Sequence, residues 1–143
     1  MPARVFLVVL LATGACRTSD IGQPCPALLG DTDPASSDGG RTETQEVVGY
    51  DPTFPCESLT CVATAGRSGY CSKGCRDDAS CPRAFECRVI QPVGEFAGQE
   101  YCAWKPCQVT SDCGPASEYC CRSAVGADPL ATKYCDFSHG HCE

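Results

Sequence analysis

Fifteen cysteines in a chain of 143 residues limit the possible fold more than any other feature of this sequence. This density is typical of disulfide scaffolds in short exported proteins. Large apolar side chains are sparse after residue 15, so hydrophobic burial alone would leave the chain unstable. The sequence therefore predicts a small disulfide-rich protein with short β-hairpins and single helical turns in tandem cysteine-rich repeats, and with little regular secondary structure.

The spacing of the cysteines predicts the repeats. Cys75 and Cys81 are each followed by another cysteine 32 residues later, and the corresponding separations after Cys71, Cys87 and Cys102 are 31, 33 and 33 residues. A nearly constant period indicates an internal repeat. We expect repeats at residues 71–106 and 107–143, and a degenerate unit at residues 25–70.

Fourteen of the cysteines are expected to form disulfides, mostly within one repeat or between adjacent repeats. Fourteen cysteines allow on the order of 10⁵ pairings, so the partners cannot be assigned from the sequence. These residues are Cys25, Cys56, Cys61, Cys71, Cys75, Cys81, Cys87, Cys102, Cys107, Cys113, Cys120, Cys121, Cys135 and Cys142.

Two polar segments between cysteines favour one helical turn each, because they hold side chains that cap the start of a turn. The candidate caps are Asp77 or Asp78, and Thr110 or Ser111. Proline and glycine end both turns. Short strands are expected to follow at residues 85–90 and 119–122.

The segment at residues 27–55 contains no cysteine and is acidic and rich in Gly, Ser and Thr. Such a composition does not support a packed core, so a long surface loop is expected. Residues 42–50 alternate partly between polar and apolar side chains and could form one edge strand. A solvated linker and a recognition loop are the two interpretations of this segment.

The first fifteen residues have the features of a secretory signal peptide. One arginine is followed by the apolar run at residues 5–12, and Thr13, Gly14 and Ala15 are small. The apolar run is too short to span a membrane. Cleavage between Ala15 and Cys16 is expected, and residues 16–24 should then form a mobile tether.

Gly14-Ala15-Cys16 resembles the lipobox of bacterial lipoproteins, although Thr13 stands where that family usually has leucine. The resemblance implies that a diacylglycerol is attached to Cys16. The odd number of cysteines agrees, since removing Cys16 leaves fourteen that can pair. Arg17 favours the outer membrane, because the inner-membrane retention signal of the family is usually aspartate at that place. Ordinary cleavage and secretion is the alternative.

The cysteine strings in the second half resemble three groups of modules: the cysteine-rich repeats of Gram-negative lipoproteins, the N-terminal module of Dickkopf proteins and part of the whey acidic protein (WAP) module. The Dickkopf-like string contains Cys107, Asp112, Cys113, Gly114, Tyr119 and Cys120. The adjacent Cys120 and Cys121 match the WAP module, which implies inhibition of serine proteases. Residues 93–99 and 114–119 are the candidate inhibitory loops.

Other kinds of site have weaker support. The x3 and x4 spacings between some cysteines fit structural zinc, but paired thiols oxidise in an exported chain. His139 and His141 are a candidate metal pair, although plain surface residues are expected there. No catalytic motif is present, so no enzyme and no cofactor are expected. Trp104 is the only tryptophan; it either packs against a disulfide or is an exposed anchor for a partner.

The sequence thus predicts a non-catalytic lipoprotein of the cell envelope, with a structural or protein-binding role and an unknown protein partner. Its contact with the outer membrane would be the lipid on Cys16. The net charge is −7 and becomes −8 when Arg4 leaves with the signal peptide. A chain of this charge, with no basic cluster, is not expected to bind nucleic acid. A secreted protease inhibitor is the first alternative, and a metal-binding protein is the second.

Overall fold

The structure is a computed structural model, and it describes residues 19–25, 46–64, 67–123, 132–138 and 142. Within these ranges the protein has eight short strands, two 3-10 turns and no α-helix. The elements are β1 (Val47–Tyr50), β2 (Thr60–Ala63), β3 (Tyr70–Cys71), η2 (Asp78–Ser80), β4 (Phe85–Val89), β5 (Glu100–Trp104), β6 (Pro106–Cys107), η3 (Thr110–Cys113), β7 (Tyr119–Ser123) and β8 (Lys133–Phe137). None of the described residues belongs to a helix long and apolar enough to cross a membrane.

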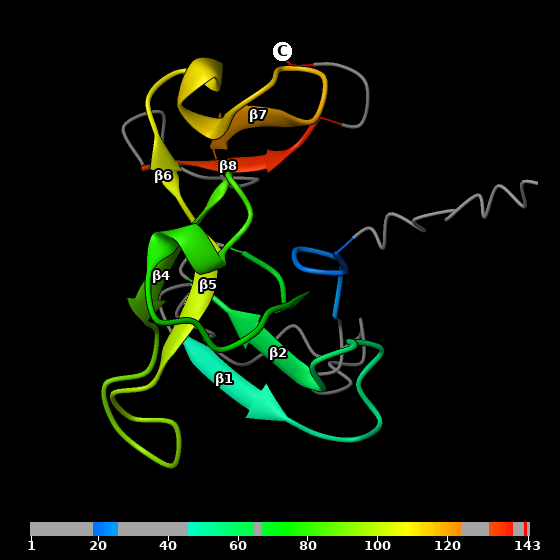
Figure 1. Ribbon diagram of the computed structural model, residues 1–143, viewed down its shortest axis with the longest axis vertical. Coiled ribbons are helices and arrows are strands. Elements are labelled where there is room, and N and C mark those ends of the chain that lie inside the picture. Colours follow the sequence, from blue (N-terminus) through cyan, green and yellow to red (C-terminus); the bar gives the residue numbers. More distant parts are fainter. Residues whose placement is uncertain (1–18, 26–45, 65–66, 124–131, 139–141, 143) are drawn as a thin grey trace, which may run out of the picture.

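The strands form three small antiparallel sheets, in the orders β1-β2-β3, β4-β5 and β6-β8-β7. The β6-β8-β7 sheet lies at one end of the molecule, β1 and β2 lie toward the other end, and β4 and β5 lie between them (Figure 1). The strands predicted at residues 85–90 and 119–122 are present as β4 and β7. The predicted edge strand is present as β1, which pairs only with β2.

Seven disulfides hold these sheets, so the predicted disulfide-rich fold is confirmed. They join Cys25 to Cys61, Cys56 to Cys71, Cys75 to Cys87, Cys81 to Cys102, Cys107 to Cys121, Cys113 to Cys135 and Cys120 to Cys142. Six of them form three groups, in each of which the first cysteine bonds the third and the second bonds the fourth. We call these groups the first unit (Cys25, Cys56, Cys61, Cys71), the second unit (Cys75, Cys81, Cys87, Cys102) and the third unit (Cys107, Cys113, Cys121, Cys135).

The backbone follows the same pattern in each unit. The third and fourth cysteines lie opposite each other on paired strands, as Cys87 and Cys102 do in the second unit. The N–H of the fourth cysteine donates to the carbonyl two residues before the first. These bonds run from Cys71 to Gln23, from Cys102 to Lys73 and from Cys135 to Lys105, at 2.8, 3.1 and 2.9 Å. The fold around each pair of disulfides is therefore the same down to individual hydrogen bonds.

Three details differ from the sequence predictions. Cys71 bonds Cys56, so it belongs to the first unit and not to a repeat that begins at residue 71. Cys121 rather than Cys120 takes the place that Cys87 has in the second unit. Asp77 caps η2 as expected, accepting a hydrogen bond from the Ser80 N–H at 2.9 Å. The third difference concerns η3, whose predicted side-chain caps are wrong because its N-cap is Val109.

Aromatic rings fill a small core that the three units share. Phe85 and Trp104 stack with their ring centroids 4.0 Å apart, Tyr70 tilts against both, and Phe137 meets Trp104 edge-on at 5.1 Å. These rings come from all three sheets. A second cluster, made by the four buried cysteines of the first unit with Phe54 beside them, lies within that unit.

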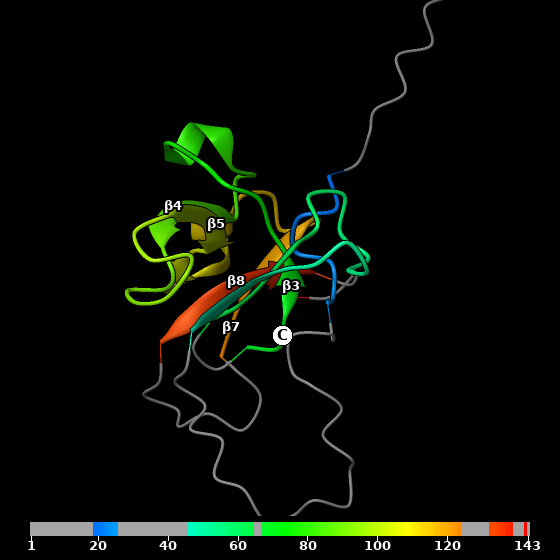
Figure 2. The same ribbon diagram turned by 90° about the horizontal axis from the view of Figure 1, so that it is seen from below.

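The N-terminal segment at residues 19–25 belongs to this core, so the prediction of a mobile tether at residues 16–24 is wrong for its described part. Ile21 is only 5% exposed. The N–H of Gly22 donates to the Cys71 carbonyl at 2.8 Å. Cys25 then enters its disulfide with Cys61. Figure 2 shows this segment lying along the strands of the first unit.

Candidate functional site

The cysteine sulfurs were one candidate metal site, and the structure places them in disulfides. The sulfurs of Cys75, Cys81 and Cys102 lie within 4.8 Å of one another, as do those of Cys107, Cys113 and Cys135. This proximity arises because the two disulfides of a unit pack side by side. A sulfur in a disulfide is not the thiolate that binds zinc. The close sulfurs are thus explained by the cross-links themselves.

Trp104, the candidate anchor for a partner, lies in the core with only 2% of its surface exposed. It ends β5, where it is opposite Phe85, and its ring is covered by Phe85, Phe137 and Tyr70. A binding hot spot must be reachable by the partner. The prediction of an exposed anchor at Trp104 is therefore wrong, and packing in the core is the role that its position gives it.

Arg67 lies over this aromatic core, which was not expected from the sequence. Its guanidinium carbon is 5.0 Å from the centroid of the Trp104 ring and 5.7 Å from that of Tyr134. The Asp136 carboxylate is 3.8 Å away, and the arginine side chain is 13% exposed. Burial lowers the pKa of Arg67, while Asp136 opposes this shift. Arg67 thus joins the first unit to the second and third by cation–π and ionic contacts.

A second ionic contact fixes β1 to the second unit. Arg88 makes two hydrogen bonds to the Glu46 carboxylate, at 2.6 and 3.1 Å, and its Nε lies 3.5 Å from Glu86. The bond to Glu46 raises the pKa of Arg88. Burial raises the pKa of Glu86, and Arg88 opposes that shift. Gln91 adds a contact, accepting from the Val48 N–H at 3.3 Å. The exposed edge of β1 is therefore partly covered.

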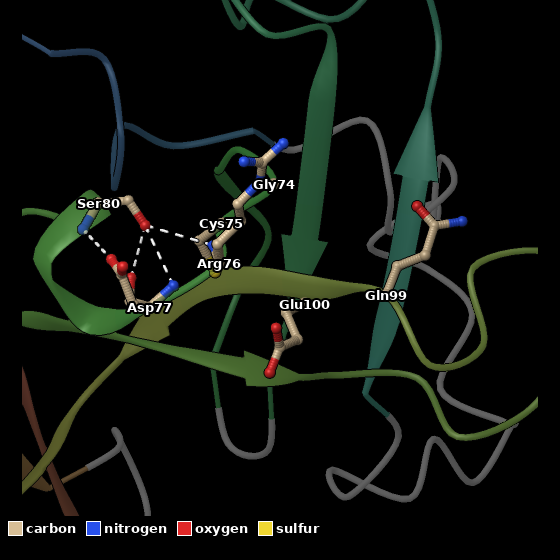
Figure 3. Close-up of a pocket in the computed structure, with 7 residues that line it drawn as sticks. All are labelled: Gly74, Cys75, Arg76, Asp77, Ser80, Gln99 and Glu100. Carbon is tan, nitrogen blue, oxygen red and sulfur yellow. Dashed lines mark hydrogen bonds between the residues drawn. The ribbon is translucent and has the colours of Figure 1, made fainter.

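An open depression of ≈ 590 Å³ lies beside η2. Its lining residues are Gly74, Cys75, Arg76, Asp77, Ser80, Gln99 and Glu100. In Figure 3, Asp77 and Ser80 are bonded to each other, whereas the side chains of Gln99 and Glu100 point in different directions. A binding site holds polar groups that converge on one ligand, and these do not converge. The depression therefore has no arrangement suited to catalysis or to small-molecule binding.

Neither candidate inhibitory loop is extended. In the loop at residues 93–99, the Ala97 N–H bonds the Gly94 carbonyl and the Gln99 N–H bonds the Phe96 carbonyl, which makes two consecutive turns. In the loop at residues 114–119, two successive N–H groups bond the Pro115 carbonyl. A strand-like inhibitory loop would leave its backbone free to pair with a protease. The turned shape of both loops does not favour that mode of binding.

The remaining predicted sites lie outside the described residues. These are the lipidation and cleavage site at Ala15 and Cys16, and the pair His139 and His141. Cys142 is described, and its disulfide to Cys120 fastens the end of the chain to β7. The structure therefore describes the fourteen bonded cysteines but not the proposed lipid carrier.

These features define the class of the molecule, a disulfide-rich protein of three similar cystine units around one aromatic core. No family model, no curated protein and no solved structure matches the chain.

The contacts made by Arg67, Gly22 and Arg88 were missed because their partners are distant in sequence. A signal was present for one of them. A lone arginine beside glycine in an otherwise uncharged stretch (residues 58–72) has few local carboxylates to bind. Such an arginine must face water or find an aromatic or acidic partner elsewhere in the fold.

Proposed function

We propose that this chain is an exported, non-catalytic lipoprotein that is attached to a bacterial outer membrane through Cys16 and displays a rigid cystine domain to a protein partner. One observation carries the proposal. The seven disulfides use fourteen of the fifteen cysteines, and the fifteenth in the sequence is Cys16. This cysteine follows a small-residue exit from an apolar segment, where the lipoprotein pathway attaches its diacylglycerol.

The disulfides support the exported part of the proposal. Cross-links form and persist in oxidising compartments, and a chain kept in a reducing cytoplasm would lose them. They also support a structural or binding role, because the core is small and the one depression has no convergent polar groups. We infer further that the three units are copies of one module, since their cysteine pairing and their backbone hydrogen bonds match.

Mass spectrometry of the protein purified from host membranes tests the proposal. A lipoprotein will begin at Cys16 and have the added mass of its acyl chains, and no free thiol will titrate without a reductant. The matched control is Cys16→Ser, which should keep all seven disulfides but move to the soluble fraction. A native protein that begins at Cys16 without added lipid, or that retains residues 1–15, would contradict the proposal.

The two alternatives remain testable with the same material. An inhibitor would slow at least one of a panel of serine proteases, and a metal-binding protein would hold stoichiometric zinc with several free thiols. The turned loops and the paired sulfurs described above favour neither.

A further inference from the structure

The N-terminal segment is fixed to the domain almost from its first described residue. The Asp20 carboxylate accepts a hydrogen bond from the Glu57 N–H at 2.5 Å. A Cβ atom added at Gly22 would lie 2.8 Å from both Phe85 and Trp104. Gly22 therefore fits against the aromatic core with no space left over. The rigid domain begins at Ser19 or Asp20, and not at Cys25.

Only three peptide units separate Cys16 from Ser19 in the sequence. An extended chain spans at most about 3.6 Å per residue, so the Cα atoms of Cys16 and Ser19 are at most about 11 Å apart. A domain of about 100 residues has a radius of gyration of about 13 Å. The link between a lipid on Cys16 and the folded domain is thus shorter than the domain is wide.

We propose that this short link holds one particular face of the domain, the face around Ser19, Asp20 and Glu57, against the surface of the phospholipid membrane. The inference rests on the proposed lipidation of Cys16. Asp20 and Glu57 are acidic, so this face has no electrostatic attraction for anionic lipid headgroups. The link alone, and not an affinity of the surface for lipid, keeps the face at the membrane.

This placement fixes which parts of the domain point away from the membrane. The loop between β4 and β5 lies on the opposite side of the molecule from the N-terminal segment in both views (Figures 1 and 2). Val93 in that loop is 73% exposed. The β4–β5 loop is therefore the part of the second unit that a partner would meet first.

Trp104 reports the distance to the membrane, because it is the only tryptophan in the chain and packs on Gly22. The lipidated protein would be reconstituted into vesicles that contain a dansyl-headgroup lipid, and energy transfer from Trp104 to dansyl would be measured. A variant with ten Gly/Ser residues inserted between Thr18 and Ser19 has a link longer by about 17 Å on average. The control variant has the same insertion between Gly39 and Gly40, in the segment whose composition predicts a surface loop.

The native chain and the control should show strong transfer, and the extended link should lower it by about twofold or more, since transfer falls steeply with distance. Equal transfer in the native and extended proteins, with both floating on the vesicles, would overturn the inference while lipidation stood. A chain that has no acyl mass and does not float would overturn both the inference and the proposed function.

Discussion

Replacing Gly22 with alanine tests whether the N-terminal segment is part of the core. The new Cβ would lie 2.8 Å from Phe85, 2.8 Å from Trp104 and 2.9 Å from Phe137. Real Cβ atoms do not come so close to ring carbons, so the rings must move, and overpacking of this kind costs about 1–3 kcal/mol. Gly22 also has φ +90°, a conformation that costs a residue with a side chain about 1 kcal/mol more.

The matched control is Gly98→Ala. Gly98 has φ +74°, but a Cβ there would meet nothing within 4 Å. This variant should therefore lose about 1 kcal/mol from backbone strain alone, whereas Gly22→Ala should lose about 3 kcal/mol. The difference of about 2 kcal/mol isolates the steric contact with the rings.

Guanidinium denaturation with the disulfides intact, followed by the fluorescence of Trp104, measures both values. Small proteins with intact disulfides can unfold in two states, which allows the free energies of unfolding to be compared. Equal losses in the two variants would refute the packing of Gly22 between the rings. That result would return residues 19–24 to the mobile tether predicted from the sequence, and it would remove the basis for the membrane-facing surface.

Three further predictions concern the contacts that join and close the units. Arg67→Met should keep the free energy of unfolding within about 1 kcal/mol of the native value, because the longer side chain still covers the rings, while Arg67→Ala should lose about 2 kcal/mol or more; chemical denaturation decides, and equal losses would contradict this role. Asp112 accepts hydrogen bonds from two backbone N–H groups, which lower its pKa. Its contribution to stability should therefore be present above the carboxylate pKa of the unfolded chain, about 3.9. It should be lost as the pH falls through the lower folded-state pKa, and Asp112→Asn should flatten that part of the melting-temperature profile. Replacing Cys120 and Cys142 together by serine should leave the other six disulfides in place and cost about 3 kcal/mol, the chain-entropy value for the 22-residue separation; peptide mapping and thermal melting measure the two effects, and reshuffled pairs would contradict the first.

The class of fold could be predicted from the sequence because cysteine density and the sparsity of apolar residues are properties of composition. The strands β4 and β7 could also be predicted, since each has an aromatic residue and a cysteine beside a proline- or glycine-rich turn. The cap of η3 could not. Thr110 has the right side chain for an N-cap, but Asp112 accepts hydrogen bonds from the Gln108 and Val109 N–H groups and satisfies the start of the turn from inside it.

The disulfide partners could not be predicted because spacing alone does not distinguish the two cysteines of an adjacent pair. Cys120 is 33 residues after Cys87, the separation that also joins Cys102 to Cys135, so the period favours it. The strand decides otherwise. In β7 the residue opposite Cys135 is Cys121, and this cross-strand position is the one that Cys87 holds opposite Cys102. A count along the chain cannot reveal this one-residue offset, whereas the register of the hairpin does.

The role of Trp104 was open in the sequence for a related reason. A single tryptophan between two cysteines is compatible with an exposed anchor and with a buried ring. Its burial depends on Phe85 across the sheet, on Phe137 in the third unit and on Gly22 in the N-terminal segment. Only the folded arrangement brings these distant residues together.

Alternation along β7 explains why the third unit has a bridge that the other two lack. Successive side chains on a strand point to opposite faces, so Cys120 and Cys121 cannot reach the same partner. Cys121 makes the bond common to all units, to Cys107, and Cys120 on the other face bonds Cys142 near the end of the chain. At the other end, Gly22 fastens the N-terminal segment to the aromatic core. Both ends of the chain are thus attached to a core that all three units share. A partner would therefore meet a preformed surface, and most of its binding free energy would not be spent on ordering the domain.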